Sequence, residues 1–301
     1  MSTDQKKVSN YFTYPREFIS YKWYKPLLVG LLTFIFLVIL SFVVWGGGYA
    51  LGGASAMNEI MSADGYNGID MYTAAGVFVN MGSVAVMLVA LFLACIIVKD
   101  RPFSSYSSSR GGFDFKVFFK CVLIAIPVMG LSNLALTIAQ EGFHFNNQFT
   151  LGGFILLWLL VPFQCIAEEY IFRGLITQTL GSWIKNPIIA IIIQTIVFTM
   201  GHPYNLAGKA EIFCTGLLMG VMVLLTNGLE ASCAIHVVNN VSYFLMNGFG
   251  LTTISSESDW ISVIAVIVID LVYIAILYYL KKRKTFDRIL KDDVTMFNEQ
   301  V

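Results

Sequence analysis

The sequence is poor in charged residues and has no net charge. Only 13% of the 301 residues are charged, and 19 basic residues balance 19 acidic ones. An ordinary soluble domain carries about twice this share of charged residues. The composition therefore argues against a soluble protein. Without an excess of positive charge the chain also has no field that would attract nucleic acid, so no nucleic-acid partner is expected.

Cysteines and histidines are few, and their spacing carries no familiar metal motif. The five cysteines all lie in apolar runs, and no two of them form a CxxC pair. This pattern argues against a disulfide framework and a thiolate zinc site. The chain also lacks the HExxH motif of helical zinc proteases. We expect the cysteines to be packing residues.

Apolar residues dominate the chain. They make up 57% of it, and the mean hydropathy is +0.73. A helix needs about 20 apolar residues to cross the hydrocarbon layer of a bilayer. The sequence therefore predicts an all-α, polytopic transmembrane helix bundle of about eight spans in the cell membrane. The expected spans are residues 26–45, 71–98, 121–139, 149–167, 187–202, 212–229, 231–250 and 260–280.

Lysine and arginine gather in every second connection between the spans. Of the other connections, 46–70, 140–148 and 251–259 carry acidic residues but no basic ones, and Lys209, between the fifth and sixth spans, is the one exception. Because short loops rich in Lys and Arg stay in the cytoplasm, both termini are predicted to be cytoplasmic. The expected organisation is a cytoplasmic leader (1–25), three spans (26–140), a helix core (149–250) and a last span with a basic tail (260–301).

Ionisable side chains inside spans are costly and are retained for a reason. If the fourth span continues as a helix, Glu169 and Arg173 are four residues apart and form an ion pair on one face. Glu168 lies about 100° round the helix and is left to face a cavity. Such a carboxylate suits a general base. The alternative is that these residues are the polar cytoplasmic end of a helix.

Two further four-residue spacings place polar side chains on helix faces. Phe198 and His202 share one face at the end of the fifth span, and His236 and Asn240 share one in the seventh. Taken singly, His202 is expected to be an interfacial residue, and the second pair could serve helix packing. Together with Glu168 they supply a base, a group that positions water and donors for an oxyanion, which amide hydrolysis requires.

These three motifs resemble those of the CPBP (Abi) intramembrane proteases, a family that includes CAAX prenyl endopeptidases and bacteriocin self-immunity proteins. Its EExxxR, FxxxH and HxxxN motifs correspond to residues 168–173, 198–202 and 236–240. The resemblance implies that Glu168 and His202 activate water and that His236 and Asn240 hold the oxyanion or orient the water. It makes the helix core at 149–250 catalytic, with Glu169, Arg173 and Phe198 supporting the site.

The resemblance implies an endopeptidase that cleaves a membrane-bound peptide or protein. It leaves open whether the enzyme is of the glutamate type or a metalloprotease, in which case Glu168, His202 and His236 would bind Zn²⁺. No cofactor is otherwise expected, and no oligomeric state is predicted. Simple counting of spans puts His202 at the opposite end from Glu168. We therefore expect a short fifth span, or a fourth helix that continues to about Gly181.

Two other functions fit parts of the pattern. A non-proteolytic bacteriocin-immunity or regulatory membrane protein could bind a partner through the same cavity. A transporter is suggested by Asp270, a possible proton or cation site at the centre of the last span, although a structural role is favoured for this residue. Gly216 and Gly220 form a GxxxG pattern, which predicts close helix packing.

Overall fold

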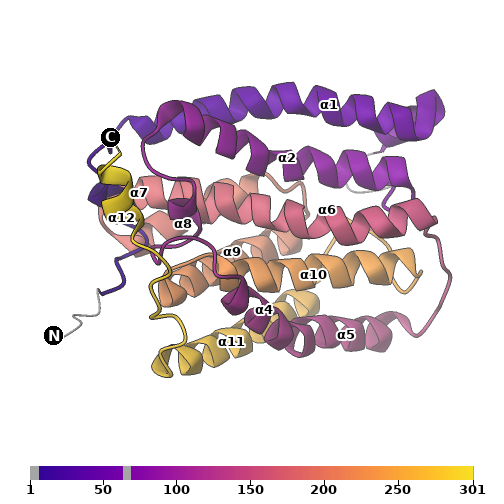
Figure 1. Ribbon diagram of the computed structural model, residues 1–301. Coiled ribbons are helices and arrows are strands. Elements are labelled where there is room, and N and C mark those ends of the chain that lie inside the picture. The colour runs from indigo at the N-terminus through magenta and orange to yellow at the C-terminus, as the bar shows by residue number, and fades with distance from the viewer. Residues whose placement is uncertain (1–6, 64–68, 301) are drawn as a thin grey trace.

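The computed structural model describes residues 7–63 and 69–300, which form a helix bundle without a β-strand (Figure 1). The predicted all-α fold is confirmed. Short helical turns lie at Tyr14–Glu17 (η1), Ile126–Gly130 (η2) and Tyr170–Ile176 (η3). The α-helices are α1 (Lys25–Ser62), α2 (Ala74–Val98), α3 (Ser104–Ser107), α4 (Phe115–Ala125), α5 (Leu131–Glu141), α6 (Leu151–Glu169), α7 (Thr177–Ile184), α8 (Pro187–Met200), α9 (Leu206–Thr226), α10 (Glu230–Gly248), α11 (Trp260–Lys282) and α12 (Asp293–Asn298).

All eight predicted spans correspond to helices, and the prediction of a multi-pass membrane protein is confirmed. In the described part of the chain, six stretches are long and apolar enough to cross a membrane. The other two are α8, an apolar helix of 14 residues, and α10, which carries the polar residues of the third motif. The six stretches are Lys25–Ser62, Ala74–Val98, Phe115–Glu141, Leu151–Ile184, Leu206–Thr226 and Trp260–Lys282.

The first connection was predicted to be a loop over residues 46–70, and this is wrong for its first part, because α1 continues to Ser62. The glycines in this stretch serve helix packing instead. A side chain at Gly48 would collide with Val79 of α2, and one at Gly52 would collide with Ala75. Gly53, with a φ of 69°, interrupts the regular helix, a backbone conformation that glycine adopts readily.

The GxxxG pattern of α9 packs against α8, as predicted. An added Cβ at Gly216 would lie 2.9 Å from the side chain of Thr195, and one at Gly220 would lie 2.5 Å from that of Ile191. Both contacts are closer than a real Cβ atom makes, so only glycine permits this helix separation. The packing holds α8, which carries Phe198 of the second motif, close to α9.

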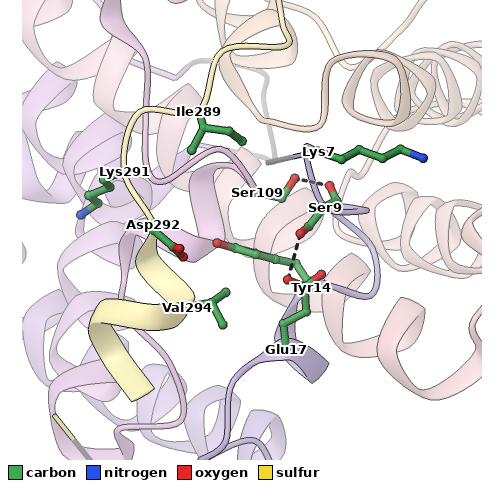
Figure 2. Close-up of a pocket in the computed structure, with 9 residues that line it drawn as sticks. All are labelled: Lys7, Ser9, Tyr14, Glu17, Ser109, Ile289, Lys291, Asp292 and Val294. Carbon is green, nitrogen blue, oxygen red and sulfur yellow. Dashed lines mark hydrogen bonds between the residues drawn. The ribbon is translucent and has the colours of Figure 1, made fainter. Parts of the chain in front are cut away.

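The N-terminal leader and the C-terminal tail meet at one end of the bundle (Figure 1). The backbone N–H of Ile19 donates to the side chain of Asn298 at 3.0 Å. Figure 2 shows the small hollow between the two segments, where the Ser9 hydroxyl donates to Glu17 and the Ser109 hydroxyl donates to the Ser9 carbonyl. The basic connections lie at this end, and its placement in the cytoplasm stays a prediction.

A buried ion pair fixes the start of α10 at the same end. The guanidinium of Arg110 lies 2.5 Å from a carboxylate oxygen of Glu230, and the other oxygen accepts the N–H of Asp114 at 2.8 Å. The Arg110 and Glu230 side chains are almost completely buried. Because His236 lies less than two helical turns further along α10, this anchor also sets its depth in the bundle.

Candidate active site

The predicted ion pair between Glu169 and Arg173 is confirmed. Arg173 Nη1 lies 3.0 Å from Glu169 Oε1, and both side chains are fully buried. The guanidinium also donates to the carbonyl of Gly216 at 3.4 Å and lies over the ring of Phe198, 4.4 Å from its centroid. Arg173 therefore ties the helix that carries the two glutamates to both α8 and α9.

The chain from α6 to α7 is one continuous helical stretch, with the π-helical turn η3 starting directly after Glu169. The prediction that the fourth helix continues to about Gly181 is confirmed, since the stretch ends at Ile184. Its 34 residues span about 51 Å, well beyond a hydrocarbon layer of about 30 Å. π-Helical turns are often found at functional sites, and this one carries Arg173.

His236 joins the two adjacent glutamates. Its Nδ1 lies 3.1 Å from Glu169 Oε1, the same oxygen that binds Arg173, and its Nε2 lies 3.5 Å from Glu168 Oε2. Because a carboxylate oxygen accepts, the contact with Glu169 makes Nδ1 the donor and turns Nε2 toward Glu168. The four side chains form a series that runs from Arg173 through Glu169 and His236 to Glu168.

The two glutamates differ in exposure, as the helix-face argument predicts. The side chain of Glu169 is completely buried and bound to Arg173 and His236, whereas that of Glu168 is 12% exposed. Within the described chain, His236 is the one residue with which Glu168 forms an ion pair or side-chain hydrogen bond. Glu168 is thus the carboxylate left able to receive a water molecule or substrate.

His202 lies just beyond the C-terminus of α8, a helix whose start is fixed by local sequence. The side chain of Asn186 caps the first turn and Pro187 occupies its first position. At the other end, Nδ1 of His202 donates to the carbonyl of Phe198 at 2.8 Å, and the two ring centroids are 4.6 Å apart. This hydrogen bond leaves Nε2 of His202 available to another partner.

A ring contact links the helical stretch that carries Glu168 to the helix that precedes His202. Phe198 packs on Phe172 with ring centroids 4.8 Å apart. Phe198 precedes His202 by four residues and Phe172 follows Glu168 by four, so the proximity of His202 to Glu168 stays a prediction. In the described part of the chain His202 forms no ion pair or hydrogen bond with Glu168. A water shared by the two side chains remains a proposal.

Asn240 belongs to an amide cluster one turn beyond His236. Its side-chain N–H donates to Gln164 at 3.2 Å, and its oxygen accepts from Asn239 at 3.2 Å. Asn239 accepts in turn from Asn133 of α5 at 3.0 Å. The sequence reasoning missed Gln164 and Asn133. Gln164 could have been found, because it precedes Glu168 by four residues and so shares its helix face.

The zinc alternative requires Glu168, His202 and His236 to surround one ion. Among residues 7–63 and 69–300, no three His, Cys, Asp or Glu side chains form a group that could hold a metal ion. Zinc dependence stays an open alternative. The mechanism proposed below is written for the side chains alone, as a general base, a partner that orients it and hydrogen-bond donors.

Comparison with known proteins places a family resemblance over this cluster. Residues 149–242 match the family described as type II CAAX prenyl endopeptidase Rce1-like, and the predicted resemblance to the CPBP family is confirmed for this region. The chain is also 25% identical, over 169 residues and 50% of its length, to the uncharacterized protein YyaK of Bacillus subtilis strain 168. The match spans 54% of that relative's length. No solved structure matches the chain.

Proposed function

We propose that the protein is an intramembrane endopeptidase of the glutamate type, which hydrolyses a peptide bond in a membrane-associated peptide or protein. One observation carries the proposal: the buried series Arg173, Glu169 and His236 ends at Glu168, the one partly exposed carboxylate of the four side chains. A nucleophile-activating base whose partner is oriented by a third group is a recurring catalytic arrangement. The family match over residues 149–242 supports the same reaction.

In the proposed mechanism Glu168 acts as the general base. It removes a proton from a water molecule while the water oxygen attacks the carbonyl carbon of the scissile amide. The negative charge that develops on the carbonyl oxygen is stabilised by hydrogen-bond donors. The candidates are the Asn240 amide and the imidazoles of His236 and His202, each of which donates through Nε2 when both ring nitrogens carry a proton. The C–N bond then breaks, and Glu168 transfers its proton to the leaving amine.

Glu169 and Arg173 have a positioning role in this mechanism. Glu169 holds Nδ1 of His236 at 3.1 Å, which fixes the orientation of the imidazole toward Glu168. Arg173 neutralises Glu169, since an unpaired carboxylate at this depth would be strongly unfavourable. Because Glu168 is the base and Glu169 positions His236, we expect Glu168 variants to lose activity and keep the fold, whereas Glu169 variants lose stability.

The test is cleavage of a membrane-bound peptide by the purified protein in liposomes. The Glu168→Gln and His202→Ala variants are expected to lower the rate by about 10²–10⁴-fold at unchanged protein level. Matched controls are Glu257→Gln and His144→Ala, whose side chains are exposed outside the cluster. Full function in Glu168→Gln would contradict the proposal and favour a non-proteolytic immunity or regulatory protein.

A further inference from the structure

A second buried carboxyl group lies in the bundle away from the proposed active site. Asp270 is in the middle of α11, ten residues or more from either end of Trp260–Lys282, and its side chain is completely buried. Neither of its carboxylate oxygens has a hydrogen-bond partner within the described chain. An ionised carboxylate in such a position would have lost its hydration without compensation.

Two side chains that face Asp270 come from α9, and Tyr273 of α11 also interacts with it electrostatically. The hydroxyl of Thr215 lies against the carboxyl group, and Glu211 interacts with it electrostatically. The Thr215 hydroxyl is itself buried and has no hydrogen-bond partner in the described residues. The turn η2, which also packs on α11, contains no titratable residue. Asp270 therefore meets a neutral hydroxyl and a second acid, and no described cation pairs with it.

The same face of α9 leads to one end of the bundle. Glu211 precedes Thr215 by one helical turn, is only partly buried, and accepts a hydrogen bond from the Ser258 hydroxyl at 2.9 Å. Ser258 belongs to the connection between α10 and α11. Polar side chains thus follow one another from this connection through Glu211 and Thr215 to Asp270.

We propose that Asp270 is a proton-binding site within the α9–α11 interface, which exchanges its proton with solvent through Glu211. A proton is the occupant that needs least space, and the site is completely enclosed. A neutral carboxylic acid has one O–H donor and remaining acceptor capacity, and the Thr215 hydroxyl can both donate and accept. A small side-chain rotation would satisfy both groups.

This site is separate from the proposed catalytic cluster. Gly216, the residue after Thr215, contacts Arg173 through its carbonyl, so consecutive residues of α9 serve the two sites from faces about 100° apart. Asp270 has no described hydrogen bond or ion pair with the four catalytic-cluster side chains. The Asp270→Asn variant is therefore expected to cleave peptide at the wild-type rate.

Infrared difference spectroscopy of the purified protein in lipid tests the inference. The wild-type spectrum minus that of Asp270→Asn is expected to show, near neutral pH, the carbonyl band of an un-ionised carboxylic acid that shifts in heavy water. A carboxylate band in its place would overturn the proposal. So would Na⁺-dependent thermal stabilisation that the Asp270→Asn variant loses, because it would identify a metal cation as the occupant.

Two further variants keep the test decisive if Asp270→Asn does not fold. Thr215→Val removes the facing hydroxyl and is expected to shift the frequency of the acid band while retaining it. Glu211→Gln is expected to slow the exchange of this band in heavy water, whereas the exposed control Glu257→Gln should leave it unchanged. An unshifted band in Thr215→Val or an unchanged exchange rate in Glu211→Gln would contradict the proposed site and route.

Discussion

The two neighbouring glutamates should lose very different amounts of stability on the same substitution to glutamine. Glu169→Gln removes the counter-ion of Arg173, which is then left with the Gly216 carbonyl and the Phe198 ring. Breaking a buried pair by removing one partner costs about 3–5 kcal/mol, and we expect Glu169→Gln to lose this much stability. Glu168→Gln should lose less than about 1 kcal/mol, because Glu168 is partly exposed and, among the described residues, its ion-pair partner is Nε2 of His236 alone.

A double-mutant cycle separates the ion pair from other effects. Arg173→Met leaves Glu169 buried with His236 alone, and the double variant Glu169→Gln/Arg173→Met leaves neither charge unpaired. The double variant should therefore be more stable than the sum of the single losses predicts, by about 2 kcal/mol. Reversible unfolding in mixed micelles measures all four proteins. Additivity within about 0.5 kcal/mol, or equal destabilisation by Glu168→Gln and Glu169→Gln, would refute the reasoning.

Three further predictions, with one control variant, test other parts of the fold by thermal unfolding in detergent. Tyr11→Phe removes the hydroxyl that donates to the Tyr106 carbonyl at 2.6 Å and should cost about 1–3 kcal/mol; an unchanged melting temperature would contradict this. Gly220→Leu should destabilise by about 1–3 kcal/mol through its clash with Ile191, whereas Gly30→Leu, which meets no atom within 4 Å, should be neutral. The hydrogen bond from the Ser262 side chain, with the backbone N–H bonds at the start of α11, lowers the pKa of Asp259. The ionised Asp259 side chain should stabilise the start of α11 above about pH 4, and this stabilisation should be lost as the pH falls through the lowered pKa. The difference in melting temperature between the wild type and Asp259→Ala should therefore narrow in acid. A difference that stays constant would contradict this capping role.

The sequence predicted the features of the site that depend on a single helix. The four-residue spacing of Glu169 and Arg173 was sufficient to predict their ion pair, and the same geometry separated Glu168 from it. The spacing of Gly216 and Gly220 likewise predicted a closely packed helix surface, and the structure shows that its partner is α8. These predictions succeed because helical periodicity fixes which side chains share a face.

Features that depend on how helices rotate against each other were not predictable. The motif resemblance paired His202 with Glu168, whereas the structure places Nε2 of His236 beside that carboxylate. The amide cluster that joins Asn240 to α5 and α6 also required the bundle to be assembled. The continuation of α1 through the glycines was missed because glycine usually weakens a helix, and here its small size allows α2 to approach.

The leader and the first spans contribute to the site from outside the matched region 149–242. Tyr11 is completely buried, and its hydroxyl lies 3.3 Å from the carbonyl of Arg173. Figure 1 shows α6 between α2 and α10, so α2 supports the helix that carries the glutamates from the side opposite His236. The position of the proposed catalytic cluster thus depends on segments that carry none of the three motifs.

The central claim is that Glu168 activates water to hydrolyse a peptide bond within the membrane. It is tested most directly by incubating the purified protein and a membrane-bound peptide in heavy-oxygen water and weighing the products. We expect one heavy oxygen in the new carboxyl terminus with the wild-type protein and no such product with Glu168→Gln. Equal labelled product from both proteins would contradict the role of Glu168 as the base.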